Sequence, residues 1–119
     1  MTQVPANVRI GEFSHEAIAA PIAATDAPPK IVSMTFSSLN VARGSVWRGH
    51  IVTATNVASV EVRTNLFSID VPRAAPGHFA FTLNIFDTPP IFVRAYRLRV
   101  IARNTAGVQS EEDLPFQIR

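Results

Sequence analysis

The side chains best suited to chemistry in this chain include three histidines: His15, His50 and His78. They lie far apart in the sequence, and only His15 has an adjacent potential ligand, Glu16. A zinc site needs three or four converging ligands, so this pair alone does not predict one. The chain has no cysteine, which excludes thiolate nucleophiles and cysteine-based zinc sites. We therefore expect solvated histidines, with no metal and no cofactor.

Carboxylates gather at one place, where Glu111, Glu112 and Asp113 follow one another. Oxygen-rich loops bind calcium, but this run lacks the turn spacing of such a loop. We expect the three acids to lie in a loop between the last two strands and to keep it hydrated. No serine lies in a nucleophile elbow, and no glycine-rich phosphate loop is present. The sequence thus predicts no catalytic residues and a protein that is not an enzyme.

Arginines form the third candidate group. Strand alternation along residues 96–103 would place three of them on the face opposite the core, and the neighbouring strand would add a fourth. The candidate partner-binding face therefore consists of Arg63, Arg97, Arg99 and Arg103. Glu61 and Ile101 interrupt this basic stripe. Such a face either stays hydrated, which discourages sheets from stacking, or binds an acidic partner.

Strands must position these residues, because apolar and polar residues alternate with a period of two after Pro29. The expected strands are 31–41, 46–56, 59–64, 66–71, 78–86, 92–103 and 114–118. No amphipathic helix separates them, and parallel sheets normally need crossover helices, so we expect antiparallel sheets. The sequence predicts an all-β fold, a two-sheet antiparallel sandwich of about seven strands.

Shared parity on three of these strands predicts the core. Its expected members are Val60, Val62, Phe79, Phe81, Leu83, Tyr96, Leu98, Val100 and Ala102. The segment Pro72–Gly77 should break the chain between strands. Pro115 cannot donate to a ladder, which indicates that the last strand begins at an edge or a bulge.

Composition divides the chain into residues 1–29, an extended N-terminal arm, and residues 30–119, the sandwich. The arm ends in a spacer, Ala17–Pro29, with six alanines and three prolines. Ahead of it, Val8 and Ile10 alternate with polar residues as in a short pairing strand. We expect Asn7–Phe13 to pair, either with the edge of its own sheet, which we favour, or with a neighbouring copy.

Several partner classes can be assessed from composition. Eleven basic and nine acidic residues give a net charge of only +2, so nucleic acid is not expected as a partner. No run of about 18 apolar residues predicts a membrane span. Residues 1–10 lack the apolar stretch of a secretory signal, so either the protein stays inside the cell or the sequence is a mature or cloned fragment.

The run YRLRVIARNTAG, residues 96–107, resembles the penultimate strand of fibronectin type III domains. The matching positions are Tyr96, Leu98, Val100, Ala102, Asn104 and Gly107. The resemblance implies that the tyrosine ring packs into the core and that its hydroxyl binds a backbone group. Residues 57–86 also resemble bacterial immunoglobulin-like repeats, through the sequence Gly77-His78-Phe79. Together the two resemblances cover residues 30–119 and imply an immunoglobulin-like or fibronectin III-like sandwich.

One residue departs from the fibronectin pattern, because Trp47 stands at the start of the second strand rather than in its middle. We expect it in the core or half-buried, with a cap at one end of the sandwich and a ligand-stacking role as the alternatives. The resemblance is specific for fold and nearly silent on function. We expect a binding or adhesion module that contacts a protein or glycan, and the fold analogy favours an extracytoplasmic or cell-surface setting. The alternative is a structural subunit, a homo-oligomer assembled by sheet-edge or N-terminal strand pairing.

Overall fold

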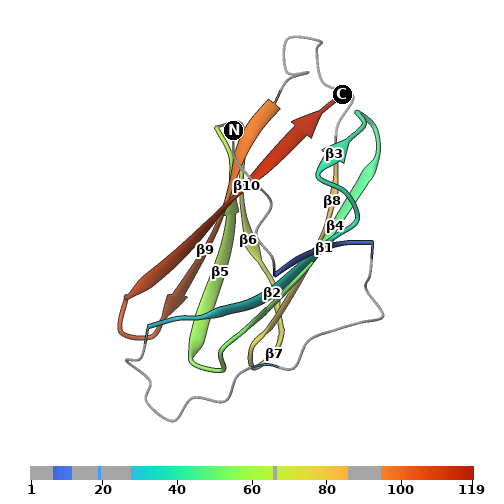
Figure 1. The fold of residues 1–119 in the computed structure, drawn as a ribbon. Coiled ribbons are helices and arrows are strands. Elements are labelled where there is room, and N and C mark those ends of the chain that lie inside the picture. Colours follow the sequence, from blue (N-terminus) through green and yellow to red (C-terminus); the bar gives the residue numbers. More distant parts are fainter. Residues whose placement is uncertain (1–6, 12–18, 20–27, 66, 86–94) are drawn as a thin grey trace.

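The structure, a computed structural model, describes residues 7–11, 19, 28–65, 67–85 and 95–119. These residues form ten strands arranged in two five-stranded sheets, which pack face to face as two layers (Figure 1). The predicted all-β, two-sheet sandwich is confirmed. Within the described residues, no helix is long and apolar enough to cross a membrane.

The first sheet has the order β1-β2-β4-β8-β7. Its strands are β1 (Val8–Ile10), β2 (Ile31–Phe36), β4 (Val46–Thr53), β8 (His78–Asn84) and β7 (Arg73–Ala75). The second sheet has the order β3-β10-β9-β5-β6. Its strands are β3 (Asn40–Val41), β10 (Gln109–Ile118), β9 (Ala95–Asn104), β5 (Val57–Arg63) and β6 (Ser68–Val71).

Both sheets are antiparallel in their interiors, but each is mixed at one edge, so the expectation of purely antiparallel sheets is wrong there. β1 runs parallel to β2, and β3 runs parallel to β10. Parallel neighbours need a long connection rather than a helix as such. Residues 11–30 connect β1 to β2, and six other strands separate β3 from β10.

The predicted core residues face the space between the sheets. Eight of the nine are buried, and Leu83 is partly buried against them. Trp47 is fully buried, so its core interpretation is confirmed. Its ring centroid lies 5.8 Å from that of Phe36, 4.9 Å from that of Phe81 and 4.8 Å from that of Phe116. Its indole Nε1 donates a 2.8 Å hydrogen bond to the Ser38 carbonyl, which satisfies the one polar atom of the ring.

Gly49 makes room for this aromatic cluster. It occupies the inward position of β4 between Trp47 and Ile51, where a side chain would enter the core. A Cβ atom there would lie only 2.3 Å from the Phe81 ring and 3.1 Å from the Phe36 ring. Glycine inside a strand often marks such a close approach.

β10 is longer than predicted, because it begins at Gln109 rather than Leu114. It pairs with β9 from Gln109 opposite Arg103 to Gln117 opposite Ala95. The three consecutive acids, residues 111–113, therefore lie in a strand, and their predicted place in a loop is wrong. The partner strand supplies a ladder along this whole length, and alternation lets charged residues occupy the outer face.

Pro115 lies within β10 on its uncovered side. The backbone nitrogens of Gln117 and Arg119 donate to the carbonyls of Leu39 and Val41 beside β3. The nitrogen of Pro115, two residues earlier, faces the same side, where β3 has not yet begun. Among the described residues the missing donor thus falls at a sheet edge, as predicted, but inside the strand and not at its beginning.

Other predicted boundaries shift or fall outside the described residues. The segment Pro72–Gly77 was expected to be a break, but it contains β7, which pairs with β8. Three proline-free residues, Arg73–Ala75, suffice for this short edge strand. His15, Phe86, residues 92–94 and most of the Ala17–Pro29 spacer lie outside the described residues.

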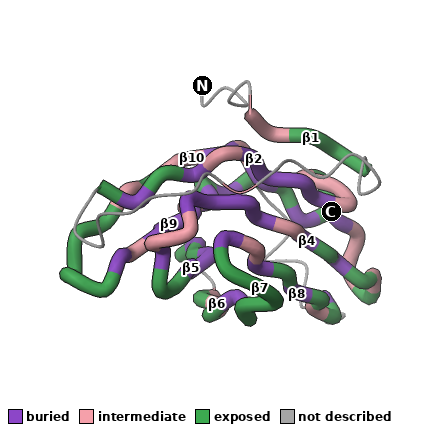
Figure 2. The backbone as a smooth tube through the Cα atoms, turned by 90° about the horizontal axis from the view of Figure 1, so that it is seen from below, coloured by how far each residue is buried: buried purple, intermediate pink, exposed green. Residues whose placement is uncertain are grey.

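The N-terminal residues Val8 and Ile10 lie in β1, opposite Met34 and Phe36 of β2 in parallel register. The Met34 nitrogen donates to the Asn7 carbonyl at 2.9 Å, and the Gly11 nitrogen donates to the Phe36 carbonyl at 2.7 Å. Figure 2 shows that β1 is largely exposed whereas β2 beneath it is largely buried. Within this chain, β1 therefore covers the edge of β2.

Candidate functional site

The outer face of the second sheet brings the four predicted arginines together. Arg63 at the end of β5 lies directly opposite Arg99 of β9. Arg97 and Arg103 share the same face of β9, because every second residue of a strand points to one side. Like charges directly opposite each other destabilise a sheet unless acids compensate them.

Glu61 supplies part of this compensation. Arg63 donates to its Oε2 from Nε at 2.7 Å and from Nη2 at 2.6 Å. Arg103 Nη1 lies 3.1 Å from Oε1, and the Ser68 hydroxyl donates to Oε2 at 2.6 Å. The Ser68 hydrogen bond, together with those from Arg103 and Arg63, outweighs burial and lowers the pKa of Glu61. Glu61 is thus a charged bridge between two arginines and not a mere interruption of the stripe.

Asp113 compensates the other two arginines. Arg97 Nε donates to Asp113 Oδ2 at 3.0 Å, and its Nη2 contacts the same oxygen. Arg99 Nε lies 3.8 Å from Asp113 Oδ1, which is too far for a hydrogen bond. The Arg99 side chain therefore makes an ion pair but no hydrogen bond with the described residues. It remains 42% exposed, so its donors can reach a ligand.

A hollow of about 330 Å³ opens on this face at the Arg99 end. We call it the arginine hollow. Its lining residues are Arg63, Thr64, Asn65, Arg97 and Arg99, with no acid among them. Arg103, the fourth predicted residue, does not line it. The structure thus gathers three of the four predicted arginines around one space and adds Thr64 and Asn65, which the sequence analysis missed.

Charge on this face is polarised along the strands. The end at the arginine hollow carries three cations and one carboxylate on the strands of the sheet: Arg63, Arg97, Arg99 and Asp113. The opposite end carries one cation and three carboxylates: Arg103, Glu61, Asp70 and Glu111. The described strands of this face are therefore neutral as a whole, and basic only near the hollow. Ile101, which lies opposite Glu61 and Glu111 at the acidic end, is buried.

Glu112 points to the other side of the same sheet. Leu114, Phe116 and Ile118 of β10 are buried in the core, and alternation turns Glu112 the same way. Asn7 Nδ2 donates to its Oε1 at 3.1 Å and lies 3.4 Å from the carbonyl oxygen of Ile31. The Glu112 Oε2 atom is buried with no hydrogen bond from the described residues. Burial raises the pKa of Glu112, and the Asn7 hydrogen bond only partly opposes this.

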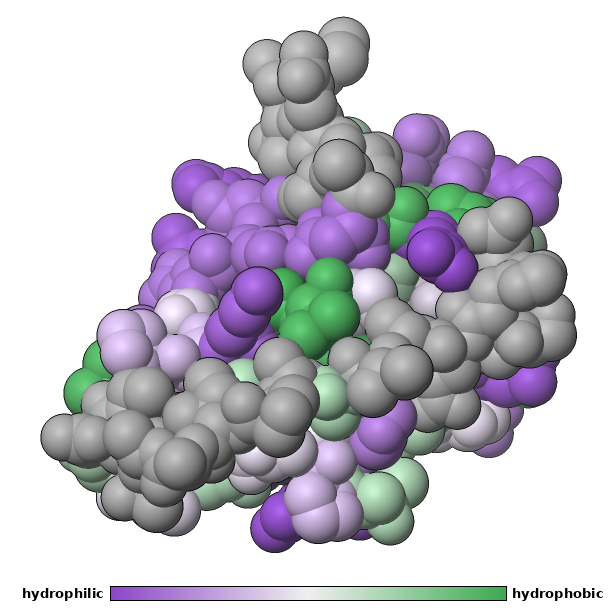
Figure 3. Space-filling view, turned by 60° about the horizontal axis from the view of Figure 1, so that its bottom comes forward, coloured by the Kyte–Doolittle hydropathy of each residue, from purple (hydrophilic) through white to green (hydrophobic). Residues whose placement is uncertain are grey.

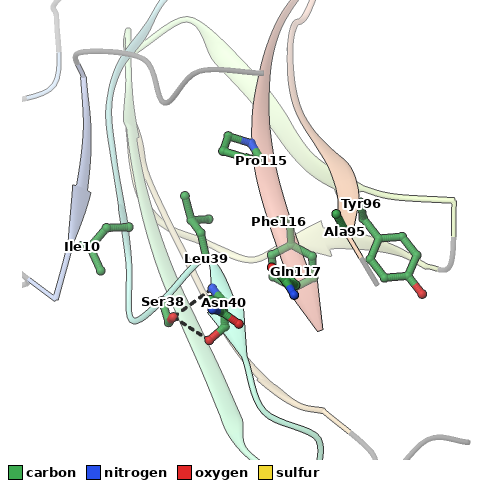
Figure 4. Close-up of a pocket in the computed structure, with 9 residues that line it drawn as sticks. All are labelled: Ile10, Ser38, Leu39, Asn40, Ala95, Tyr96, Pro115, Phe116 and Gln117. Carbon is green, nitrogen blue, oxygen red and sulfur yellow. Dashed lines mark hydrogen bonds between the residues drawn. The ribbon is translucent and has the colours of Figure 1, made fainter. Parts of the chain in front are cut away.

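A second hollow, of about 350 Å³, is mainly apolar. Figure 4 shows Ile10 of β1 on one side, Pro115 and Phe116 of β10 on the other, and Leu39 between them. No charged side chain lines it. The exposed large apolar side chains among the described residues are Ile10, Val46 and Val108, on three separate elements. The face in Figure 3 likewise shows a small hydrophobic patch bordered by hydrophilic residues.

Two histidines that are distant in sequence lie side by side. His50 of β4 and His78 of β8 have ring centroids 5.8 Å apart, because the two strands are paired. Predicting this pair from the sequence would have required knowing that these two strands are neighbours in the sheet. In the described part of the chain, no group of three or more histidine, cysteine, aspartate or glutamate residues is placed to hold a metal ion.

No protein-family model and no curated protein matches this sequence. Among solved structures, the chain is similar to a DUF4785 family protein from Legionella pneumophila, with a TM-score of 0.57, 13% sequence identity and 71% of this chain covered. It is also similar to a Niemann-Pick type C2 protein from Japanese carpenter ant, with a TM-score of 0.53, 13% identity and 77% covered. The chain spans 27% of the Legionella protein and 93% of the ant protein. At this identity the likeness concerns the fold alone, and it supports an immunoglobulin-like β-sandwich.

Proposed function

We propose that this protein is a non-catalytic binding module, which contacts an acidic group of a protein or glycan partner through the arginine hollow. The observation that carries this proposal is Arg99. Its guanidinium lines the hollow, is partly exposed and makes no hydrogen bond with the described residues. A guanidinium presents several donors in a planar fork that matches carboxylate, sulfate or phosphate oxygens.

The neighbouring residues support an acid-binding role. Arg63 and Arg97 have side chains that are 48% and 61% exposed, so they also reach solvent at the hollow. Glu61 and Asp113 hold these two arginines by ion pairs, which limits the side-chain freedom that a ligand would otherwise have to restrict. The site is thus ordered before a ligand arrives.

Self-assembly through sheet edges is the alternative, and the described edges favour it less. β1 has three residues and includes Arg9, and β7 has three residues between Pro72 and Pro76. The uncovered side of β10 carries Pro115 and the inward-facing Glu112. Short edges, prolines and inward charges all discourage pairing with another chain.

We also infer that the sandwich is closer to the fibronectin type III or bacterial immunoglobulin-like kind than to other immunoglobulin-like sandwiches. Support comes from the YRLRVIARNTAG run together with the buried state of Tyr96 and Ala102. Trp47 in the core of β4 agrees with a tryptophan on the second long strand. An adhesion role outside the cytoplasm would follow from that kinship.

The test is a binding assay with acidic probes of both partner classes. Calorimetry would measure binding of galacturonic acid, a sulfated N-acetylgalactosamine and a glutamate-rich peptide to the purified chain. We expect at least one probe to bind, and the double variant Arg97→Gln/Arg99→Gln to lose that binding. The matched control is Arg73→Gln, which removes one charge from β7 in the other sheet. The proposal is wrong if no probe binds, or if the double variant binds like the control.

A further inference from the structure

We propose that the ligand of the arginine hollow is a single anionic sugar unit, a uronic acid or a sulfated sugar, rather than an acidic protein surface or an extended polyanion. This inference rests on the proposed function and names the ligand class of the same site. It follows from three features of the hollow: its size and donors, the charge polarity of the surrounding face, and the scarcity of apolar contacts at its rim.

The size and donors of the hollow suit one small polar unit. Its volume of about 330 Å³ lies at the lower limit for small-molecule pockets, which run from about 300 Å³ upward. Arg97 and Arg99 are two residues apart on one face, about 7 Å along the strand, and Arg63 faces Arg99 across the ladder. An oxyanion between them would be approached by donor groups from two strands. Asn65, which is exposed, adds a carboxamide that matches sugar hydroxyl groups, whereas the buried Thr64 accepts a hydrogen bond from the Phe67 nitrogen through its hydroxyl oxygen.

Charge polarity limits the ligand to a discrete anionic group. Next to the hollow along the same face lie three carboxylates, those of Glu61, Asp70 and Glu111. A uniformly charged polymer laid along the strands would meet this acidic end within about 7 Å of Arg99, inside the Debye length at physiological salt. Repulsion there opposes a nucleic acid or another long polyanion. A single acidic sugar, with neutral units on either side, avoids that repulsion.

The rim offers little to a protein partner. Protein interfaces of stable complexes bury about 1,200–2,000 Å² and concentrate their energy in a few fully desolvated anchors, mostly aromatic residues and arginine, that fill pockets on the partner. Among the described residues, the exposed large apolar side chains are Ile10, Val46 and Val108, and none of them lines the hollow. Phe67, close in sequence to Asn65, packs against the core instead. The hollow therefore provides charge and hydrogen bonds but no anchor pocket for a protein side chain.

The experiment compares probes that differ only in their anionic group. Galacturonic acid and its methyl ester differ in one carboxylate, and sulfated and unsulfated N-acetylgalactosamine differ in one sulfate. We expect calorimetry to show binding of galacturonic acid or the sulfated sugar, and loss of that binding with the neutral partner of the pair. The arm that binds distinguishes a carboxylate from a sulfate.

Variants locate the site. Arg99→Gln should weaken binding by about ten- to a hundredfold, the usual effect of losing charged hydrogen bonds, whereas Arg73→Gln should leave it unchanged. Arg99→Lys keeps the charge but loses the planar fork, so it should restore only part of the affinity. Circular dichroism melting of each variant verifies that the fold is intact.

The outcomes separate this inference from the proposed function. If a glutamate-rich peptide binds with the same Arg99 dependence and no sugar does, the sugar assignment is wrong but the acid-binding module stands. If a single-stranded DNA oligonucleotide binds more tightly than the sugars through Arg99, the discrete-group argument is wrong. If no probe shows Arg99-dependent binding, both proposals fail.

Discussion

Glu61 and Glu112 lie on opposite faces of one sheet; Glu61 is buried, and Glu112 is partly buried with its Oε2 atom inaccessible to solvent. On the outer face, two guanidinium groups and a hydroxyl bind Glu61, and its pKa lies below the ordinary value. On the inner face, Glu112 accepts one hydrogen bond, from Asn7, and burial raises its pKa. The comparison teaches that the number of hydrogen-bond and ionic partners, together with burial, sets the direction in which folding shifts the pKa of each carboxyl.

The two faces consequently tolerate different changes. The outer face is held by charges that compensate one another, and removing one of them leaves another uncompensated. The inner face is stabilised by apolar packing, and Glu112 places an ionisable side chain among these apolar residues. Loss of packing inside should therefore cost more than loss of charge outside, and loss of the Glu112 charge should cost nothing.

The largest effect is expected for Phe81→Ala, which measures the inner face by itself. The Phe81 ring is buried against Trp47 and Phe36, with centroids 4.9 and 6.4 Å away. The truncation leaves a cavity and should lower the free energy of unfolding by about 3–5 kcal/mol. Thermal melting followed by circular dichroism should show a drop of more than about 10 °C. A variant that melts within a degree or two of the parent would contradict the core assignment.

Gly49→Ala tests the same face by adding an atom instead of removing atoms. The new Cβ would approach the Phe81 ring to 2.3 Å, so the ring must move. Overpacking of this kind costs about 1–3 kcal/mol, measurable by urea unfolding. The double variant Gly49→Ala/Phe81→Leu provides the control, because the smaller side chain yields space. The double variant should be more stable than the summed losses of Gly49→Ala and Phe81→Leu predict. If the two losses are simply additive, Gly49 is not required to make room for the Phe81 ring.

Much of the inner face follows from the sequence, because alternation alone identifies its residues. The alternation of apolar and polar residues predicts that the side chains of Val60, Phe79 and Leu98 point inward, and each is buried. The same rule, extended two residues back from Leu114, turns Glu112 inward. The last strand is expected from the sequence to begin only at Leu114, because a run of acids is typical of a loop. Only the β9–β10 register shows that the strand continues.

The candidate site was less predictable, because its geometry depends on which strands are neighbours. Alternation along the strand predicts that Arg97 and Arg99 share one face. The expected sandwich topology places Arg63 of the neighbouring strand on the same face. The roles of Asp113 and Ser68 depend on the β9–β10 and β5–β6 pairing, for which the sequence carries no local signal. Residue contacts across strands are set by register, and register is a property of the whole sheet.

Glu61→Gln tests the outer face with a neutral side chain of the same shape. Arg63 and Arg103 would lose their common counter-ion, and we expect a loss of about 1–2 kcal/mol at neutral pH, limited by the exposure of both arginines. Because folding lowers the pKa of Glu61, its contribution is present above the ordinary value of 4.5 and is lost as pH falls through the folded-state pKa. Urea unfolding at neutral and acid pH should therefore show a gap that closes in acid.

The control for this change is Glu111→Gln, an exposed acid on the same face whose side chain is bonded only to Gln109 among the described residues. It should alter stability by less than about 0.5 kcal/mol. If Glu61→Gln behaves like this control at neutral pH, the bridge between the two arginines contributes nothing, and the contrast between the faces disappears.

The smallest effect, and the one of opposite sign, is expected for Glu112→Gln. The glutamine can still accept the Asn7 hydrogen bond, but it no longer carries a charge into the interior, so the variant should melt a few degrees higher at neutral pH. Folding raises the pKa of Glu112 above 4.5, so its favourable contribution is complete below that value and is lost as pH rises through the folded-state pKa. The gap between variant and parent should therefore open with rising pH, as for Glu61, but with the opposite sign, because here the variant and not the parent becomes the more stable protein. Asn7→Ala in the parent removes the one partner and should move this opening to still higher pH. A variant that melts below the parent at neutral pH, by a difference that vanishes in acid, would show that Glu112 is as well compensated as Glu61.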